Sequence, residues 1–198
     1  MKQPALIVMV KEPRAGRVKT RLGRQIGMTS AAWWYRHQVT RLLRQLRDPR
    51  WRIILAIAPD TAVASRVWPD DLVRLPQGKG DLGQRMARAL KATPGPTLLV
   101  GSDIPGITRG HILQGFRALG HVPAVIGPAR DGGFWLVGLR HPARSPRALF
   151  RNVRWSHLNT LAETIPTLPQ PVRTITRLSD VDDAEDLVPA SAVSGQFD

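Results

Sequence analysis

The fold prediction rests on the segment Thr97-Leu-Leu-Val-Gly-Ser-Asp103-Ile-Pro-Gly-Ile-Thr108. Its apolar first part is typical of a buried strand, which ends abruptly at Asp103 among small and turn-forming residues. A second apolar run ends in the same way in Pro123-Ala-Val-Ile-Gly-Pro-Ala-Arg-Asp131-Gly-Gly-Phe-Trp-Leu-Val-Gly138. Open α/β sheets carry their functional groups at the carboxyl ends of strands. The two acidic corners therefore predict one shared site.

Strand-like and helix-like segments alternate outward from this centre. Strands are expected at 4–10, 53–58, 98–100, 122–126, 134–137 and 172–176. Helices are expected from a cap at Thr29 or Ser30 to Leu46, at 82–90, from a cap at Thr108 to Leu119, and at 183–187. The alternation predicts a three-layer α/β fold with a mainly parallel sheet, in which the strand at 134–137 is reversed. We expect one domain over residues 1–190 and a flexible tail over 191–198.

Composition narrows the classes of partner. The 198 residues suit one domain that buries roughly 70% of its unfolded surface. The chain has no cysteine, no apolar run of the ~20 residues that cross a bilayer, and no signal peptide, so a cytoplasmic protein without a membrane partner is expected. The net charge is +14, with 24 Arg among 29 basic residues, spread without a nucleic-acid-binding motif. A small phosphorylated ligand, and no specific nucleic acid, is the predicted partner. Oligomeric state is not predictable.

The loop after the first strand is rich in cations. Its basic residues are Lys11, Arg14, Arg17, Lys19 and Arg21. A loop in this position can direct backbone amides, Lys and Arg at phosphate groups. It is not a Walker A loop, because it lacks the Gly-Lys-Ser/Thr core. The alternative interpretation is a solvated basic surface loop.

Residues 78–83, Gly-Lys-Gly-Asp-Leu-Gly, match the dinucleotide-binding fingerprint, and Asp103 lies at about the right distance downstream. We reject that interpretation because the fingerprint must close a proper strand, whereas only Val73-Arg-Leu75 and Pro76 precede it. A flexible glycine loop that leads into a helix is the prediction, with simple structural punctuation as the alternative.

Asp103 and Asp131 are the candidate metal ligands, because carboxylate oxygens suit Mg²⁺ or Mn²⁺ bound together with substrate phosphates. A helix-capping or turn carboxylate is the alternative for Asp103, and an ordinary Asp-Gly turn for Asp131. A third acidic group follows at residues 180–186, of which one or two carboxylates are expected to touch metal. Ser102 lacks the Gly-x-Ser-x-Gly elbow of a hydrolase, and the five histidines show no metal-ligand spacing.

Six collinear motifs together resemble the radical-SAM/selenodomain-associated transferase family. This family has the nucleotide-diphospho-sugar transferase (GT-A) fold and is related to 2-phospholactate and phosphoenolpyruvate guanylyltransferases and, more distantly, to molybdenum-cofactor nucleotidyltransferases. The motifs lie at residues 11–22, 77–85, 101–106, 127–138, 149–155 and 180–187.

The resemblance implies a role for each matched position. Phosphate contacts would come from Gly16, Lys19 and Arg21, with Asp103 and Asp182 as the ligands of Mg²⁺ or Mn²⁺. Asp103, Lys19 and Arg21 are the candidate catalytic residues. The remaining candidate substrate-binding residues are Lys11, Arg14, Gln77, Gly78, Gly80, Asp81, Gly83, Arg85, Ser102, Asp131, Gly132 and Gly133. The chain departs from the family pattern at Phe134-Trp135 and at Asp183, so the role of a hydroxyl group at those positions is in doubt.

Three functions follow from these residues. The preferred one is a metal-dependent nucleotidyltransferase that joins an NTP to a phosphorylated small acid and releases pyrophosphate, because a cation-rich loop suits a triphosphate. A glycosyltransferase that uses an NDP-sugar needs the same parts. The third is a non-catalytic nucleotide- or nucleic-acid-binding protein.

Overall fold

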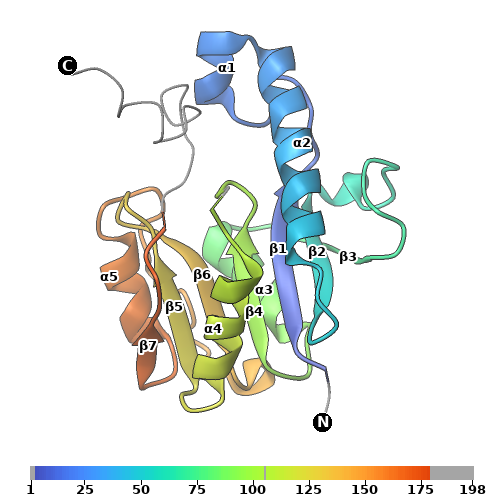
Figure 1. Ribbon diagram of the computed structural model, residues 1–198. Coiled ribbons are helices and arrows are strands. Elements are labelled where there is room, and N and C mark those ends of the chain that lie inside the picture. Colours follow the sequence, from blue (N-terminus) through green and yellow to red (C-terminus); the bar gives the residue numbers. More distant parts are fainter. Residues whose placement is uncertain (1–2, 105, 179–198) are drawn as a thin grey trace, which may run out of the picture.

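The computed structural model describes residues 3–104 and 106–178, which contain a seven-stranded sheet (Figure 1). The strand order is β3-β2-β1-β4-β6-β5-β7. The strands are β1 (Ala5–Lys11), β2 (Arg52–Ala58), β3 (Val73–Pro76), β4 (Thr97–Gly101), β5 (Ala124–Pro128), β6 (Phe134–Leu139) and β7 (Val172–Thr174). β6 is antiparallel to both β4 and β5, whereas the other pairings are parallel. The predicted mainly parallel sheet with one reversed strand is confirmed.

Helices cover both faces of the sheet. They are α1 (Thr20–Ile26), α2 (Met28–Leu46), α3 (Leu82–Lys91), α4 (Arg109–Leu119) and α5 (Thr160–Thr164), with short 3₁₀ turns at Asp60–Ala62, Pro142–Arg144 and Ile165–Thr167. α2 and α4 lie over the face in front in Figure 1, and α3 lies behind. The central strands are apolar on both sides, as parallel strands covered by helices must be.

β1 shows how the two core layers form. Leu6 and Val8 pack in the layer that contains Leu42 of α2, whereas Ile7 packs in the layer that contains Leu90 of α3. Successive side chains of a strand point to opposite faces, so one apolar run supplies both layers.

The predicted start of the first expected helix was wrong. The cap expected at Thr29 or Ser30 lies inside α2, which begins at Met28 after Gly27. Gly27 has a φ of +91°, which an L residue rarely adopts, and it separates α2 from the unpredicted helix α1. The periodicity of residues 20–26 was hidden by the cations of the preceding loop.

A second correction concerns residues 73–76, which were discounted as a strand. They form β3, in parallel register with Ile54–Ile57 of β2 at the edge of the sheet. Pro76 is tolerated there because an edge strand leaves one side of its backbone unpaired. The strand–loop–helix context of residues 78–83 is therefore present, contrary to the sequence-based expectation.

Other predicted elements agree with the structure to within a few residues. Thr108 caps α4 and accepts a hydrogen bond from the backbone of His111 (3.3 Å). Among residues 3–104 and 106–178, no helix is long and apolar enough to cross a bilayer. The predicted helix at 183–187, Asp182 and the tail at 191–198 lie outside the described residues, and the extent of the domain stays a prediction.

Gly138 tests the packing between the sheet and its core. A Cβ at this position would lie 2.3 Å from Leu98 Cδ2 and 2.7 Å from Val125 Cγ1, both in neighbouring strands. We expect Gly138→Ala to lower the free energy of unfolding in urea by about 1–3 kcal/mol through overpacking. The control is Gly110→Ala at an exposed position of α4. A Cβ there would lie 3.5 Å from the nearest atom, and helix propensity favours Ala by up to ~1 kcal/mol. Equal stability changes would contradict the prediction.

Candidate active site

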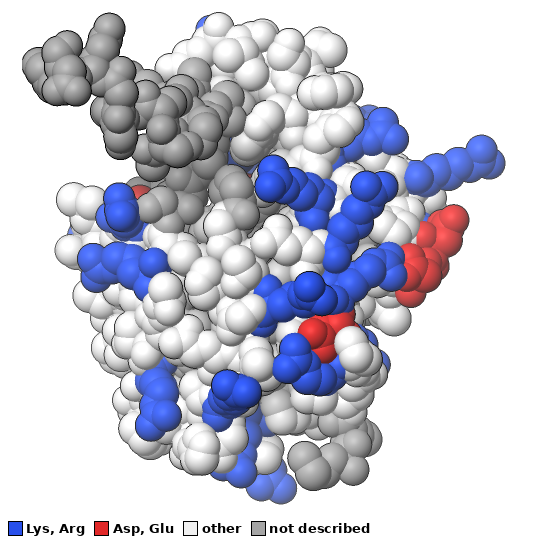
Figure 2. Space-filling view, in the orientation of Figure 1, with Lys and Arg blue, Asp and Glu red and all other residues white. Residues whose placement is uncertain are grey.

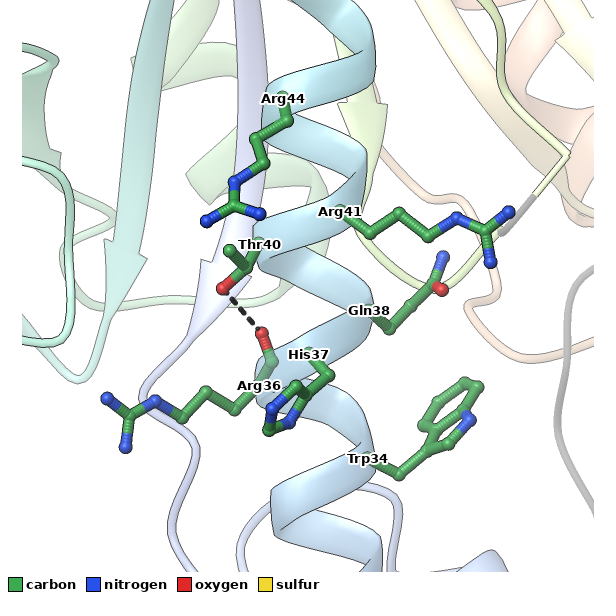
Figure 3. Close-up of a pocket in the computed structure, with 7 residues that line it drawn as sticks. All are labelled: Trp34, Arg36, His37, Gln38, Thr40, Arg41 and Arg44. Atoms are coloured by element: carbon green, nitrogen blue, oxygen red, sulfur yellow. Dashed lines mark hydrogen bonds between the residues drawn. The ribbon is translucent and has the colours of Figure 1, made fainter.

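A cleft of about 610 Å³ lies where β1, β3 and β4 end, and where β5 turns into β6. Eight of the predicted site residues line it: Lys11, Lys19, Gln77, Arg85, Ser102, Asp103, Asp131 and Gly133. The two acidic corners therefore share one site, as the sequence predicted. A larger hollow of about 870 Å³ runs along the outer side of α2 (Figure 3), but Asp and Glu are absent from its described lining residues. The cleft, which contains Asp103 and Asp131, is therefore the candidate active site.

Parallel pairing brings the first and fourth strands together at the floor of the cleft. Met9 of β1 pairs with Gly101 of β4, so Lys11 and Asp103 follow at the same edge of the sheet. Among the described residues, apart from its immediate neighbours in the chain, none has a heavy atom within 4 Å of a Cβ built on Gly101, so these residues leave this part of the floor open. Residues from two segments far apart in the chain thus surround one open space.

Lys19 turns from the basic loop toward Asp103. Its backbone is left-handed, with φ 45° and ψ 49°, immediately before α1. The side chain is only 6% exposed, and its Nζ lies 3.4 Å from Asp103 Oδ2, whereas the Asp103 side chain is 52% exposed. A left-handed residue other than glycine costs of order 1–3 kcal/mol and is concentrated at functional sites. The loop is thus built to present a buried ammonium beside an accessible carboxylate.

The arginines of the loop lie outside the cleft lining. Arg14 pairs with Glu12, with its Nε 2.6 Å from Glu12 Oε2, and is largely exposed. Arg21 is an exposed residue of α1. Neither these two residues nor Gly16 is among those that line the cleft. Sequence reasoning could not separate them from Lys11 and Lys19, because the direction of each side chain depends on how the loop folds.

Tyr35 of α2 connects the two strand ends. Its Oη accepts from the backbone N–H of Lys11 (3.0 Å) and lies 2.8 Å from Ser102 Oγ, which donates to Asp103 Oδ1 (3.3 Å). Since the one Ser102 proton goes to Asp103, the phenol must donate to Ser102. Burial, and next the negative charge of Asp103, raise the pKa of Tyr35. Tyr35 therefore stays neutral and orients the residue beside Asp103.

Gln77 and two arginines shape the glycine loop. Gln77 Nε2 donates to the carbonyls of Val10 (3.1 Å) and Ala56 (2.9 Å), and its Oε1 accepts from Arg85 (3.2 Å). Arg88 donates to the carbonyls of Gln77 (2.5 Å) and Lys79 (3.0 Å). The Arg88 guanidinium packs against Gly78, where a Cβ would lie 2.6 Å from Arg88 Nη1, and sequence analysis missed this arginine.

Several residues that were predicted to bind substrate have structural roles and do not line the cleft. Asp81 caps α3, where its Oδ1 accepts from the backbone of Gln84 (2.8 Å). Gly83 lets α3 approach Trp155, and Gly132 approaches the backbone of Leu158. Gly80 has a φ of +107°. The structure therefore explains why these glycines and Asp81 occur at their positions without a role in ligand binding.

The far side of the cleft is aromatic and acidic. Asp131 Oδ1 accepts from the backbone of Gly133 (2.9 Å), which is the turn that the alternative interpretation expected, yet Asp131 is exposed in the cleft lining. Phe134 and Trp155 stand edge to face with centroids 6.4 Å apart. The loop that carries Trp155 has left-handed residues at Phe150, Asn152 and Ser156. The sequence analysis placed Trp155 in the motif at 149–155 without giving it a role of its own.

The carboxylates of the cleft suit a divalent metal ion that takes some of its coordinating oxygens from the bound substrate. Among the described residues, no three His, Cys, Asp or Glu side chains gather as a metal site. Mg²⁺ is held in many nucleotide sites by one or two carboxylates together with substrate phosphates and water. Asp103 has that accessibility and chemistry, whereas the role of Asp182 stays a prediction.

Comparison with known proteins agrees with this geometry. Residues 41–157 match the family described as "Uncharacterized protein conserved in bacteria (DUF2064)". A provisionally named nucleotide-diphospho-sugar transferase from Desulfovibrio desulfuricans G20 is 30% identical, with a TM-score of 0.81 over 94% of this chain and 85% of that chain. No curated protein matches the sequence.

More distant structures share the fold. Rv0371c of Mycobacterium tuberculosis H37Rv, in complex with manganese, is 14% identical, with a TM-score of 0.56 over 94% of this chain and 96% of that chain. The 2-C-methyl-D-erythritol 4-phosphate cytidylyltransferase of Thermus thermophilus is 18% identical, with a TM-score of 0.54 over 94% of this chain and 96% of that chain. The predicted transferase-type α/β fold is confirmed. The association with radical-SAM proteins stays a prediction.

The Tyr35 network makes a spectroscopic prediction. Tyr35 is the single tyrosine of the chain, so the ultraviolet absorbance of tyrosinate reports on it alone. In the folded protein its titration should lie above the ordinary value of about 10, and it should return to about 10 in denaturant. A pKa raised by folding adds stability that is complete below pH ~10 and is lost as pH rises through the folded pKa. An ordinary titration midpoint in the folded state would contradict the buried network.

Proposed function

Because the chain belongs to the DUF2064 family and shares the fold of nucleotide-using transferases, we propose that it is a metal-dependent transferase that takes a nucleotide donor in the cleft. The observation that carries the proposal is the pair Lys19–Asp103 at the open ends of β1 and β4. The pair places a cation that can bind phosphate oxygens in contact with a carboxylate that can bind a divalent metal.

The preferred donor is a nucleoside-diphosphate sugar. Of the five basic residues in the loop at 11–21, only Lys11 and Lys19 line the cleft, which weakens the argument for a triphosphate. Arg85, the third cation of the lining, is engaged with Gln77, so Lys11, Lys19 and one metal ion are left for the ligand and suit the charge of a diphosphate. The D. desulfuricans relative, provisionally named for such donors, supports the same choice.

In this reaction the bond between the anomeric carbon of the sugar and the diphosphate oxygen breaks while an acceptor atom bonds to that carbon. Lys19 and Lys11 stabilise the negative charge that develops on the leaving diphosphate. Mg²⁺ or Mn²⁺ held by Asp103 would supply further positive charge when bound. Ser102 and Tyr35 keep the Asp103 carboxylate oriented.

The acceptor is placed on the side of Asp131, Phe134 and Trp155. The Arg154 guanidinium, beside Trp155 in the chain, is engaged with Glu163 (Nε–Oε1 2.7 Å), so it is not directed at a ligand. The described lining of this side offers a carboxylate, aromatic rings and hydroxyl groups. These groups favour a hydroxyl- or amine-bearing acceptor over the phosphorylated small acid first preferred from the sequence.

Nucleotidyl transfer is the second candidate, favoured by the fold likeness to cytidylyltransferases and by the position of a basic loop after β1. The products separate the two reactions. Glycosyl transfer releases a nucleoside diphosphate from an NDP-sugar, whereas nucleotidyl transfer releases pyrophosphate from an NTP.

Donor binding should be visible as thermal stabilisation. We expect an NDP-sugar with Mn²⁺ or Mg²⁺ to raise the melting temperature, since a ligand at 100 times its Kd adds ~2.7 kcal/mol. Lys19→Met should weaken this donor at least tenfold, because a charge-assisted contact is worth roughly 1.5–3 kcal/mol. Arg14→Gln, in the same loop but outside the cleft lining, is the matched control and should bind normally. Equal losses in both variants would overturn the assignment of Lys19.

Asp103→Asn tests the metal role. The variant keeps the size of the side chain and an acceptor for Ser102, so its melting temperature should stay near that of the parent protein. Metal-dependent turnover should fall by ~10²-fold or more, because charge stabilisation in the transition state is lost. Titration of Mn²⁺ in the presence of donor should show weaker metal binding in parallel. Full activity with unchanged Mn²⁺ affinity would make Asp103 a turn residue.

A further inference from the structure

A second surface of the molecule is rich in cations and lies outside the cleft. Residues 13–47 contain nine Arg and Lys and no Asp or Glu, within a chain of net charge +14. Much of this segment forms the α1–α2 hairpin, which projects beyond the sheet at the same end as the carboxyl ends of the strands (Figure 1). Only Lys19 among these nine cations lines the cleft. Arg14 and Arg47 form ion pairs with Glu12 and Asp71. The exposed arginines along α2 need a different explanation.

The outer side of α2 carries an arginine stripe, which we define as Arg36, Arg41 and Arg44. The three side chains leave the outer side of the helix in different directions, with Arg36 and Arg44 on one side and Arg41 on the other (Figure 3). All three are exposed, and no ion pair is recorded for them within the described part of the chain. In the space-filling view, Lys and Arg side chains gather below a top that is mostly uncharged (Figure 2). A stripe of exposed arginines of this kind attracts a polyanionic surface.

An apolar tip adjoins the arginine stripe. Ile26 at the end of α1 and Met28 at the start of α2 are exposed, and Trp33, one turn before His37, is 64% exposed. The Trp33 and His37 rings stack with centroids 3.8 Å apart, which holds the indole on the outer side of α2. Exposed Trp, Ile and Met at a projecting end are costly in water and are favourable at the boundary between lipid headgroups and acyl chains.

We propose that the α1–α2 hairpin docks the protein on an anionic lipid surface. The apolar tip would enter the headgroup region, and the arginine stripe would contact lipid phosphates. Two weak signals together, one apolar and one basic, are what reversible membrane binding requires. A nucleic acid would match the stripe but would leave Ile26 and Met28 without a role, so lipid fits the whole surface better. This revises the expectation that the chain has no membrane partner.

Docking of this kind has a consequence for the cleft. Because the hairpin and the strand ends lie at one end of the molecule, the cleft would open near the lipid surface (Figure 1). An acceptor that resides in or on the membrane could then reach it. The docking itself is independent of the proposed transferase activity and can be tested without a substrate.

Flotation of the full chain with vesicles tests the proposal. We expect binding to vesicles of phosphatidylcholine mixed with phosphatidylglycerol and little binding to phosphatidylcholine alone. Each basic residue near an anionic surface contributes roughly fivefold, so R36Q/R41Q/R44Q should weaken the partition about a hundredfold. Trp33→Ser should reduce the part of the binding that survives high salt, because screening weakens only the charge contribution.

The matched control is R140Q/R144Q/R147Q, which removes the same charge from exposed positions near the opposite end of the sheet. It should retain nearly all vesicle binding, and circular dichroism should show both triple variants folded. Equal losses in the two triple variants would mean that net charge alone attracts the protein and would overturn the docking surface. Salt-resistant binding to single-stranded RNA in place of vesicles would overturn the choice of partner.

Discussion

The site depends on the parallel pairing of β1 with β4. Every residue from Ala5 to Met9 has a partner in β4, so the two strands end at one edge with Lys11 and Asp103 beside each other. The pairing places the basic loop, which follows one strand, next to the carboxylate corner, which follows the other. Without it, the Lys19–Asp103 contact and the link from Lys11 through Tyr35 to Ser102 could not form.

The reversed strand β6 gives the cleft its second half. Because β6 runs antiparallel between β4 and β5, the turn at Asp131–Gly133 returns the chain to the same edge of the sheet. Glycine at position 138 lets the three strands pack closely at the opposite end. The charged side of the cleft, at the end of β1, and its aromatic side, at the start of β6, therefore lie at the same end of the sheet. This arrangement suits a donor with phosphates and an acceptor without them.

Two surfaces of opposite shape divide the charge of the protein. The cleft is concave and uses few cations: Lys19 pairs with Asp103, and Arg85 donates to the side-chain carbonyl of Gln77. The α1–α2 hairpin is projecting and carries exposed arginines beside exposed apolar side chains. Eight of the 24 Arg residues lie in residues 13–47, and the other 16 are spread over the rest of the chain.

The sequence by itself determined the α/β class, most strands and helices, the reversed strand and the two acidic corners, because these depend on local periodicity and on abrupt ends of apolar runs. It also predicted eight residues that line the cleft. Only the tertiary structure decided which loop cations face inward, since Arg14 and Lys19 have the same local chemistry and differ in the backbone direction before α1. Tyr35, Trp155 and Arg88 were missed for the same reason: their roles arise from contacts with residues far away in the chain. The local sequence pattern determines the secondary structure of a segment, whereas contacts with residues far away in the chain determine the role of its side chains.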